Sequence, residues 1–407
     1  MKVLQINSVC GTGSTGRIAV DLYKTLVENG HESMIAFGRN TALGNVNNVK
    51  IGSNVDNYIH VAKTRIFDKH GFGSTKATKE FIKTIEEYNP DIIHLHNIHG
   101  YYINIEILFN YLKEINKPVV WTLHDCWTFT GHCAYFDDIG CEKWKSQCYD
   151  CCQLNSYPIS KIKDNSKGNY ICKKAIFNGV NGLKVITVSS WLKGKVEQSF
   201  LKDYDIRVIN NGIDVDTFKP LDSKDKIDKK YNIQGKKIIL GVSNIWDERK
   251  GLKDFLKLSQ IIDDSFVIVL VGLNDDQIKE LPSNIIGIRR TENIEELAEL
   301  YSAAMVLVNT SVEETFGLVT VEAMACGTPV IVYNSTALPE EVGEKCGYVV
   351  EKRNVSQVID AIKKIDIEGK EYFAEHCRNR VKSLYRKQDK YQEYMNLYKE
   401  ILDISQE

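Results

Sequence analysis

Apolar runs of strand length alternate with amphipathic segments along the whole chain. In the first half, helix-like segments separate five such runs: KVLQINSV, SMIAFG, DIIHLHN, PVVWTL and KVITVSS. After residue 212 the alternation restarts with KKIILGVS and continues through FVIVLVG, IIGIR, MVLVN and TPVIVY. Apolar strands that alternate with helices are typical of a parallel sheet covered on both faces. The pattern predicts an α/β protein with two Rossmann-like halves.

The restart of the pattern divides the chain into domains. We predict an N-terminal domain over residues 1–212, a second domain over 213–375 and a terminal helix assigned to 376–407. The chain of roughly 372–404 is charged and tyrosine-rich and is expected to be helical. The length of 407 residues also favours two cores. Ligands of open parallel sheets bind beyond the carboxyl ends of the strands, so the cleft between the domains is the expected site.

Composition and charge narrow the class of protein. The chain is 43% apolar and 26% charged, as in ordinary soluble proteins, and its net charge of −2 argues against a nucleic-acid binder. No apolar run reaches 18 residues, and MKVLQINSV reads as a strand rather than a signal peptide. We therefore expect a cytoplasmic protein with eleven reduced cysteines and with small molecules or proteins as partners.

One segment, SVEETFGLVTVEAMACGTPV, holds two carboxylates around a loop-to-helix transition. Glu314 precedes Phe316, Gly317 and Leu318, and Glu322 lies in the helix-like run that follows. A helix rises ~1.5 Å per residue, so the carboxylates would lie roughly 10 Å apart and could contact a sugar and a ribose across a diphosphate. Backbone N–H groups at the helix start would face that anion. Two solvated glutamates on an amphipathic helix are the alternative.

A glycine-rich turn, GTGSTGR, follows the first strand and opens a helix. Glycine lets a backbone approach a ligand closely, so Gly13 and Ser14 are candidate ligand contacts. The turn also matches the GxGxxG of dinucleotide-binding proteins. The second strand lacks the expected acidic residue and offers only Arg39, which disfavours NAD and leaves an NADP-type dehydrogenase as an alternative. A tight turn without a ligand is the remaining interpretation.

Two further loops carry candidate site residues at strand ends. Arg249 and Lys250 precede Gly251 after the first strand of the second domain, where cations beside a leaving diphosphate would stabilise its charge. His124 and Asp125 follow the strand PVVWTL. A charged loop and a core histidine are the respective alternatives. The three histidines of HLHNIHG have no carboxylates at metal-ligand spacing, which favours a pocket-lining role for His99 and Gly100 over a metal site.

A cysteine-rich loop spans residues 131–153. Cys133, Cys141, Cys148 and Cys151 lie in a short polar segment of a chain with reduced thiols. Four such thiols fit a structural zinc ion that folds an insertion too small for its own core. Reduced loop cysteines without a metal are the alternative.

The motifs resemble the retaining GT-B glycosyltransferases, in particular family 4. The glutamate, seven residues, glutamate pattern, the lysine before Gly251 and the HDCW segment carry the resemblance. HLHNIHGYY and HDCWTFTGHC are similar to members that build bacterial capsular, exopolysaccharide or O-antigen units. The resemblance implies a GT-B fold with a C-terminal helix that crosses back to the N-terminal domain.

The resemblance also implies residue roles. Glu314 would contact hydroxyls of the donor sugar, Glu322 the ribose, Lys250 and Arg249 the diphosphate, and His124 the transferred sugar. Phe316, Gly317 and Leu318 would present backbone N–H groups to the diphosphate, with Gly13 and Ser14 beside it. Family members usually carry an arginine about six residues before the lysine. Asn244 stands there, so Arg249 would replace it. Glu340 of ALPE would cap a helix beside the sugar.

The implied reaction is metal-independent transfer of a hexosyl or related sugar, with retention, from a nucleotide diphosphate sugar to a glycan or lipid-linked acceptor. A nucleotide-sugar epimerase on the same fold and a non-catalytic nucleotide-sugar-binding protein are the alternatives. Peripheral contact with the cytoplasmic face of the inner membrane is considered for the basic segments 193–202 and Lys173-Lys174, against a solvated surface.

Overall fold

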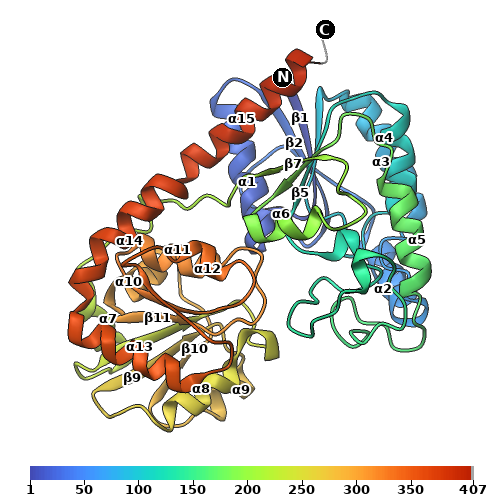
Figure 1. The fold of residues 1–407 in the computed structure, drawn as a ribbon. Helices are drawn as coiled ribbons and strands as arrows, with labels where there is room; N and C mark the ends of the chain where they lie inside the picture. The colour runs from blue at the N-terminus through green and yellow to red at the C-terminus, as the bar shows by residue number, and fades with distance from the viewer. Residues whose placement is uncertain (405–407) are drawn as a thin grey trace. The chain divides into compact units, whose positions relative to one another are not determined.

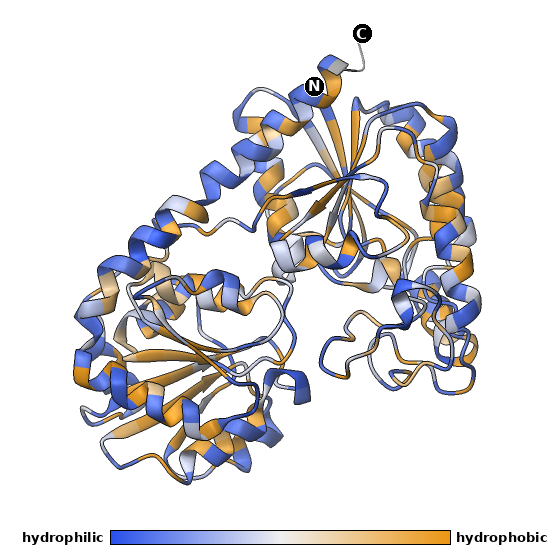
Figure 2. Cartoon of the chain, in the orientation of Figure 1, coloured by the Kyte–Doolittle hydropathy of each residue, from blue (hydrophilic) through white to orange (hydrophobic). Residues whose placement is uncertain are grey.

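The computed structural model of the chain describes residues 1–404 and contains two α/β units. Unit 1 comprises residues 1–209 together with the chain from Tyr391 onward, and unit 2 comprises residues 210–390. Each unit has one parallel sheet with helices packed around it (Figure 1). The strands of both sheets are largely hydrophobic along their length (Figure 2), which accounts for their burial.

Parallel strands form the sheet of unit 1: β1 (Lys2–Val9), β2 (Glu32–Arg39), β3 (Asn48–Lys50), β4 (Ile92–Leu95), β5 (Val119–Leu123), β6 (Lys184–Thr187) and β7 (Asp205–Val208). Their order is β3-β2-β1-β4-β5-β6-β7, so the chain winds outward from β1 in both directions. β4 and β5 are buried at every position, as expected of strands covered on both faces.

Helices connect these strands: α1 (Gly13–Glu28), α2 (Asn54–Phe67), α3 (Thr75–Tyr88), α4 (Ile105–Glu114), α5 (Ser166–Phe177) and α6 (Ser190–Val196), with the 3₁₀ turns η1 (Trp127–Phe129) and η2 (Lys143–Lys145). α1 packs on the sheet through Ile18, Leu22 and Leu26, which share one face at helical spacing. Ser53 and Asp56 form a capping box that starts α2.

Unit 2 has the strands β8 (Lys237–Val242), β9 (Phe266–Val271), β10 (Ile285–Ile288), β11 (Val306–Asn309), β12 (Val330–Tyr333) and β13 (Gly347–Val350), in the order β10-β9-β8-β11-β12-β13. Its helices are α7 (Lys224–Tyr231), α8 (Leu252–Ser259), α9 (Asp275–Lys279), α10 (Ile294–Ala303), α11 (Leu318–Ala325), α12 (Leu338–Glu341), α13 (Val355–Glu368) and α14 (Lys370–Leu384), with the 3₁₀ turn η3 (Glu248–Lys250). This is the second predicted Rossmann-like sheet.

The terminal segment consists of two helices, because α14 ends before Tyr385 and α15 (Lys387–Ile404) begins two residues later. From residue 391 on, α15 belongs to unit 1, where Tyr394, Tyr398 and Met395 join the core formed with Val3 and other sheet residues. The Tyr398 hydroxyl lies 2.6 Å from Nδ1 of the buried His94. The predicted return of the terminal helix to the N-terminal domain is confirmed.

Candidate active site

In unit 2, the loop between β11 and α11 holds Glu314 in a fixed backbone position. The Glu314 N–H donates to the Thr336 hydroxyl at 2.8 Å, and the Glu314 carbonyl accepts the Ala337 N–H at 3.2 Å. At the base of the loop, the Asn309 side chain accepts the Ser311 N–H at 3.1 Å and donates to Thr320 at 3.1 Å. These bonds lock the loop between β11 and the chain that follows β12.

Lys250 and Glu314 form an ion pair, with side chains 19% and 12% exposed. The Lys250 N–H donates to the Asp247 carboxylate at 3.0 Å, which caps the η3 turn and presents the ammonium group to the carboxylate. Arg249 lies next to this pair, and its Nη1 donates to the Glu313 carbonyl at 2.9 Å. The structure therefore brings together three of the residues singled out from the sequence, on the loops after β8 and β11.

The start of α11 is occupied by a carboxylate that sequence reasoning missed. The Gly317 N–H donates to Oε1 of Glu341 at 2.5 Å, and Glu341 is buried. Burial raises the pKa of Glu341 well above its ordinary value, and the nearby Glu314 and Glu340 raise it further. The sequence analysis singled out Glu340 of this turn, whereas it is Glu341 whose side chain binds the glycine. The two adjacent glutamates of LPEE, which follow a strand, were the feature of the sequence that could have indicated this contact.

The neighbouring predicted residues of α11 are largely buried. Phe316 packs edge-on against Tyr385, with ring centroids 5.6 Å apart, and Leu318 is the first residue of the helix. Glu322 is 8% exposed, and its Oε2 accepts the Tyr301 hydroxyl at 2.9 Å. This hydrogen bond holds a charged oxygen on an otherwise apolar helix.

In unit 1, the glycine-rich turn needs glycine for two different reasons. Gly11 has φ +74°, and a Cβ there would lie 2.6 Å from the Leu43 carbonyl oxygen. Gly13 has φ +65°, but a Cβ there would meet no atom within 4 Å. Packing therefore requires glycine at position 11. At position 13 the left-handed backbone angle alone favours glycine, because the space around it is open. Ser14 follows in the first turn of α1.

His124 lies at the end of β5, next to a chain of buried histidines. Its Nε2 lies 3.3 Å from Nδ1 of His96, whose Nε2 lies 3.2 Å from the Gln5 side-chain oxygen. Desolvation by burial lowers the pKa of His124 to about 4. The imidazole is therefore neutral at pH 7 and can offer one donor and one acceptor, but no positive charge.

The adjacent Asp125 is held by contacts that sequence reasoning did not identify. Its Oδ2 lies 2.8 Å from Nε2 of His99, and its Oδ1 accepts the Trp127 N–H at 2.9 Å. Burial alone would raise the pKa of Asp125, but His99 and the Trp127 N–H keep it below the ordinary value. Nδ1 of His99 lies 3.0 Å from the Tyr157 hydroxyl. HLHNIHG and HDCW end adjacent strands, which was the signal for this contact.

The predicted zinc ligands line one cavity of about 20 Å³ together with Cys152 and Trp144. The Cys148 sulfur accepts the Gly131 N–H at 3.2 Å, and a hydrogen bond from Cys133 lowers the pKa of Cys151 to about 7. As the side chains stand, no group of three or more His, Cys, Asp or Glu within residues 1–404 has an arrangement that could hold a metal ion. The four thiols share a cavity without forming a coordination sphere.

Lys173 lies in the interior, so neither the membrane contact nor the solvated surface considered for Lys173-Lys174 applies to this residue. It is fully buried, and its Nζ donates to the carbonyls of Trp127 at 2.7 Å and Thr130 at 3.1 Å. Desolvation lowers its pKa to about 7. The burial of Lys173 could not be predicted from the sequence, because a lysine pair on a helix usually lies on the surface. No helix within the described residues is long and apolar enough to span a bilayer.

The buried histidines predict a loss of stability in acid. Desolvation lowers the pKa of His60 and of His94 to about 3, and that of His96 well below 6.5. The folded chain stays neutral at these sites while the unfolded chain binds protons below about pH 6.5, so stability is complete above that pH and is lost as the pH falls toward about 3. Each site removes about 1.4 kcal/mol per pH unit in this window.

We expect the urea midpoint to fall steeply as the pH is lowered from about 6.5 to about 5. His94→Gln removes one titrating site and should make the fall less steep, whereas His376→Gln, on the exposed surface of α14, should leave it unchanged. A midpoint that stays constant over this range would contradict the neutral, buried state of these rings.

Solved structures with similar folds identify the architecture. Sucrose-phosphate synthase from Thermosynechococcus elongatus superposes with a TM-score of 0.76 at 19% identity, over 99% of this chain and 100% of that one. HepE from Anabaena, in complex with UDP-glucose, superposes with a TM-score of 0.70 at 16% identity, over 98% and 100% of the two chains. The protein has the GT-B fold, as predicted.

Family models extend the comparison to sequence. The model described as Glycosyltransferase Family 4 matches residues 15–217, and the model described as Glycosyl transferases group 1 matches residues 236–365. The chain belongs to glycosyltransferase family 4. An Escherichia coli K12 protein named for colanic acid biosynthesis, the glycosyl transferase WcaC, is 26% identical over 98% of this chain and 100% of its own length. The O-antigen chain mannosyltransferase RfbU of Salmonella typhimurium is 28% identical over 45% and 53%.

Proposed function

We propose that the protein is a retaining glycosyltransferase that moves a hexosyl or related sugar from a nucleoside diphosphate sugar to a glycan or lipid-linked acceptor. The ion pair between Lys250 and Glu314 carries this proposal, because it places a cation for a diphosphate beside a carboxylate for sugar hydroxyls. The UDP-glucose complex of HepE supports the donor class. The likeness to WcaC and RfbU favours surface polysaccharide assembly. A cytoplasmic location is part of the proposal.

Donor binding would exchange internal contacts for contacts with the ligand. Lys250 would leave Glu314 for the diphosphate, with Arg249 beside it, and Glu314 would then accept hydrogen bonds from sugar hydroxyls. Glu322, whose Oε2 accepts the Tyr301 hydroxyl, would also accept hydrogen bonds from the ribose. Backbone N–H groups near Leu318 would add to the phosphate contacts.

Unit 1 would contribute to the sugar and the acceptor. His124 is neutral at pH 7, so it suits a hydrogen bond to a sugar hydroxyl better than it suits neutralisation of a phosphate. Gly13 and Ser14 would lie near the diphosphate and the acceptor, since the space around Gly13 is open. His99, held by Asp125, would line the acceptor pocket.

The chemical step would be a same-face displacement at the anomeric carbon. The bond from that carbon to the diphosphate oxygen breaks as the acceptor oxygen attacks, and the leaving phosphate takes the acceptor's proton. Lys250 and Arg249 stabilise the negative charge that develops on the leaving group. Because these two side chains already supply positive charge beside the leaving group, added Mg²⁺ or Mn²⁺ is expected to give no increase in rate.

The product's anomeric configuration tests the proposal against its alternatives. The purified enzyme is supplied with a donor of known anomeric configuration and an acceptor, and the linkage formed is determined by NMR. Retention in a new glycosidic bond is expected. An isomerised nucleotide sugar with no acceptor product would indicate an epimerase, and an unchanged donor that nevertheless binds would indicate a binding protein.

We also propose that the loop 131–153 binds a structural zinc ion through Cys133, Cys141, Cys148 and Cys151. The chain between η1 and α5 has little regular structure beyond the short η2 turn, so an additional constraint would stabilise it. The four thiols already line one cavity, and small movements of this loop would gather them around the ion.

Substitution of these cysteines is expected to remove the metal and to lower stability. The purified chain should contain about one zinc per molecule by elemental analysis, in keeping with a four-thiolate site. Cys148→Ser should lose the zinc and lower the melting temperature by several degrees, because a structural zinc contributes directly to folding. Cys172→Ser, on the exposed face of α5, is the matched control. A zinc-free chain of unchanged stability would contradict the site.

A further inference from the structure

Helix α2 of unit 1 is oriented with its polar side inward. The residues that it buries are His60 and Thr64. Large apolar side chains instead lie on the surface: Val55 is 65% exposed, Tyr58 74%, Ile59 55%, Ile66 38% and Phe67 45%. A helix that packs on a sheet normally buries its apolar face, so this exposure needs another explanation.

Four of the five exposed apolar residues form one stripe, and Phe67, the last residue of α2, lies outside it at about 120° from Val55. At about 100° per residue, Val55, Tyr58, Ile59 and Ile66 fall within an arc of about 100°. His60 and Thr64 fall on the opposite side of the helix. The cations Lys63 and Arg65 lie at about 80° on either side of the stripe. An apolar stripe between two flanking cations is the arrangement of helices that lie in the surface of a bilayer.

A second segment extends this surface beyond the end of α2. The Lys161 N–H donates to the Arg65 carbonyl at 2.7 Å, and Lys163 Nζ lies 5.5 Å from the centroid of the Phe67 ring. Ile162, between these lysines, is 71% exposed. We call the α2 surface the set of residues Val55, Tyr58, Ile59, Lys63, Arg65, Ile66, Phe67, Lys161, Ile162 and Lys163.

The charge of the α2 surface differs from that of the chain. It carries four cations, whereas the whole chain has a net charge of −2. The acidic residue of α2, Asp56, is held by the N–H and hydroxyl of Ser53 in the capping box. Two of the other basic residues considered from the sequence have carboxylate partners, since Lys195 pairs with Asp137 and Lys193 with Glu197. The local positive charge fits an anionic partner.

We propose that the α2 surface docks unit 1 onto an anionic lipid bilayer. The apolar stripe would enter the boundary between headgroups and acyl chains, Tyr58 would lie at headgroup level, and the flanking cations would contact lipid phosphates. A second copy of the chain fits less well, because it would bring like charges together. Docking through the α2 surface does not depend on the donor chemistry, and it rests on the proposed function only in that a lipid-linked acceptor would make docking useful.

Vesicle flotation with the full chain tests the proposal. We expect binding to vesicles of phosphatidylcholine with phosphatidylglycerol, on the order of tenfold stronger than to pure phosphatidylcholine and weaker at high salt. Tyr58→Ser/Ile59→Ser should lose about tenfold, and Lys63→Glu/Arg65→Glu should reduce the binding to that of neutral vesicles. Ile261→Ser/Ile367→Ser, with side chains 63% and 86% exposed in unit 2, is the matched control and should bind as the wild type does.

Three results would overturn the proposal: no binding to anionic vesicles, equal loss in the control, or a dimer in solution that the Tyr58→Ser/Ile59→Ser substitution dissolves. Melting temperatures of all variants confirm that they are folded. Binding of a nucleoside diphosphate is measured in parallel. A chain that binds the nucleotide but not vesicles would refute the docking surface and leave the transferase proposal intact. A chain that binds vesicles but not the nucleotide would refute the donor site and leave the docking surface intact.

Discussion

Lys250→Ala is expected to lower kcat by about two to three orders of magnitude. One charge about 4 Å from a developing phosphate charge contributes on the order of 4 kcal/mol at an effective dielectric of 20, which corresponds to roughly three decades in rate. The Lys250 side chain is 19% exposed, so solvent screens part of this effect. The measurement is the steady-state release of nucleoside diphosphate.

Lys253→Ala is the matched control for this change. Lys253 lies three residues further along the same segment, is 74% exposed and pairs with Glu248 on the surface. Surface pairs of this kind contribute little, so kcat should change less than twofold. Equal activity of the wild type and Lys250→Ala would remove this lysine from the chemistry.

Glu322→Ala is expected to weaken donor binding by about a hundredfold. Hydrogen bonds from ribose hydroxyls to a carboxylate contribute about 1.5–3 kcal/mol each, and the substitution removes the acceptor. The dissociation constant of the nucleoside diphosphate, measured by calorimetry, reports the change. Glu322→Gln keeps an acceptor for the Tyr301 hydroxyl and therefore separates the loss of charge from the loss of this internal bond.

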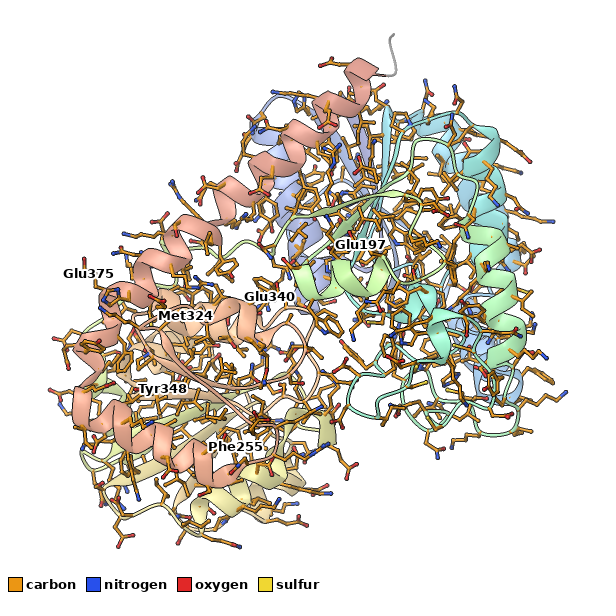
Figure 3. The ribbon with its side chains drawn as sticks, in the orientation of Figure 1. Glu197, Phe255, Met324, Glu340, Tyr348 and Glu375 are labelled. Carbon is orange, nitrogen blue, oxygen red and sulfur yellow. The ribbon has the colours of Figure 1, made fainter. Side chains whose placement is uncertain are left out.

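Glu375→Ala controls for removal of a glutamate from unit 2. Glu375 projects outward from α14 into solvent (Figure 3) and should bind the nucleotide like the wild type. If Glu322→Ala also retains full affinity, the ribose contact is wrong.

The interior strands of both sheets could be predicted from the sequence, as could the edge strand β10, whereas the other three edge strands could not. The strands named from apolar runs, such as β4, β5 and β9, are fully buried. The three strands that sequence analysis did not name, β3, β7 and β13, are all edge strands. They are short and partly exposed, so they lack the continuous apolar run that marks a central strand.

In the candidate site, too, single residues could be predicted from their local sequence, but contacts between residues far apart in the chain could not. Lys250 and Glu314 were found because each follows a strand within a recognisable segment, but their mutual ion pair joins residues 64 positions apart. Glu341 was missed because its role depends on a contact with Gly317 across the fold. The buried Lys173 and the outward apolar face of α2 also depend on which side of a helix packs, and neighbouring residues in sequence do not decide this.

The most direct test of the central claim is a thermal-shift screen of the purified chain against UDP, GDP, ADP, CMP and NADPH, repeated with Lys250→Ala and Glu322→Ala. We expect one nucleoside diphosphate to raise the melting temperature by several degrees, and both substitutions to abolish the shift. The absence of a shift with any nucleoside diphosphate would contradict the donor site. A shift with NADPH alone would contradict it too and would favour a dinucleotide site at the glycine-rich turn.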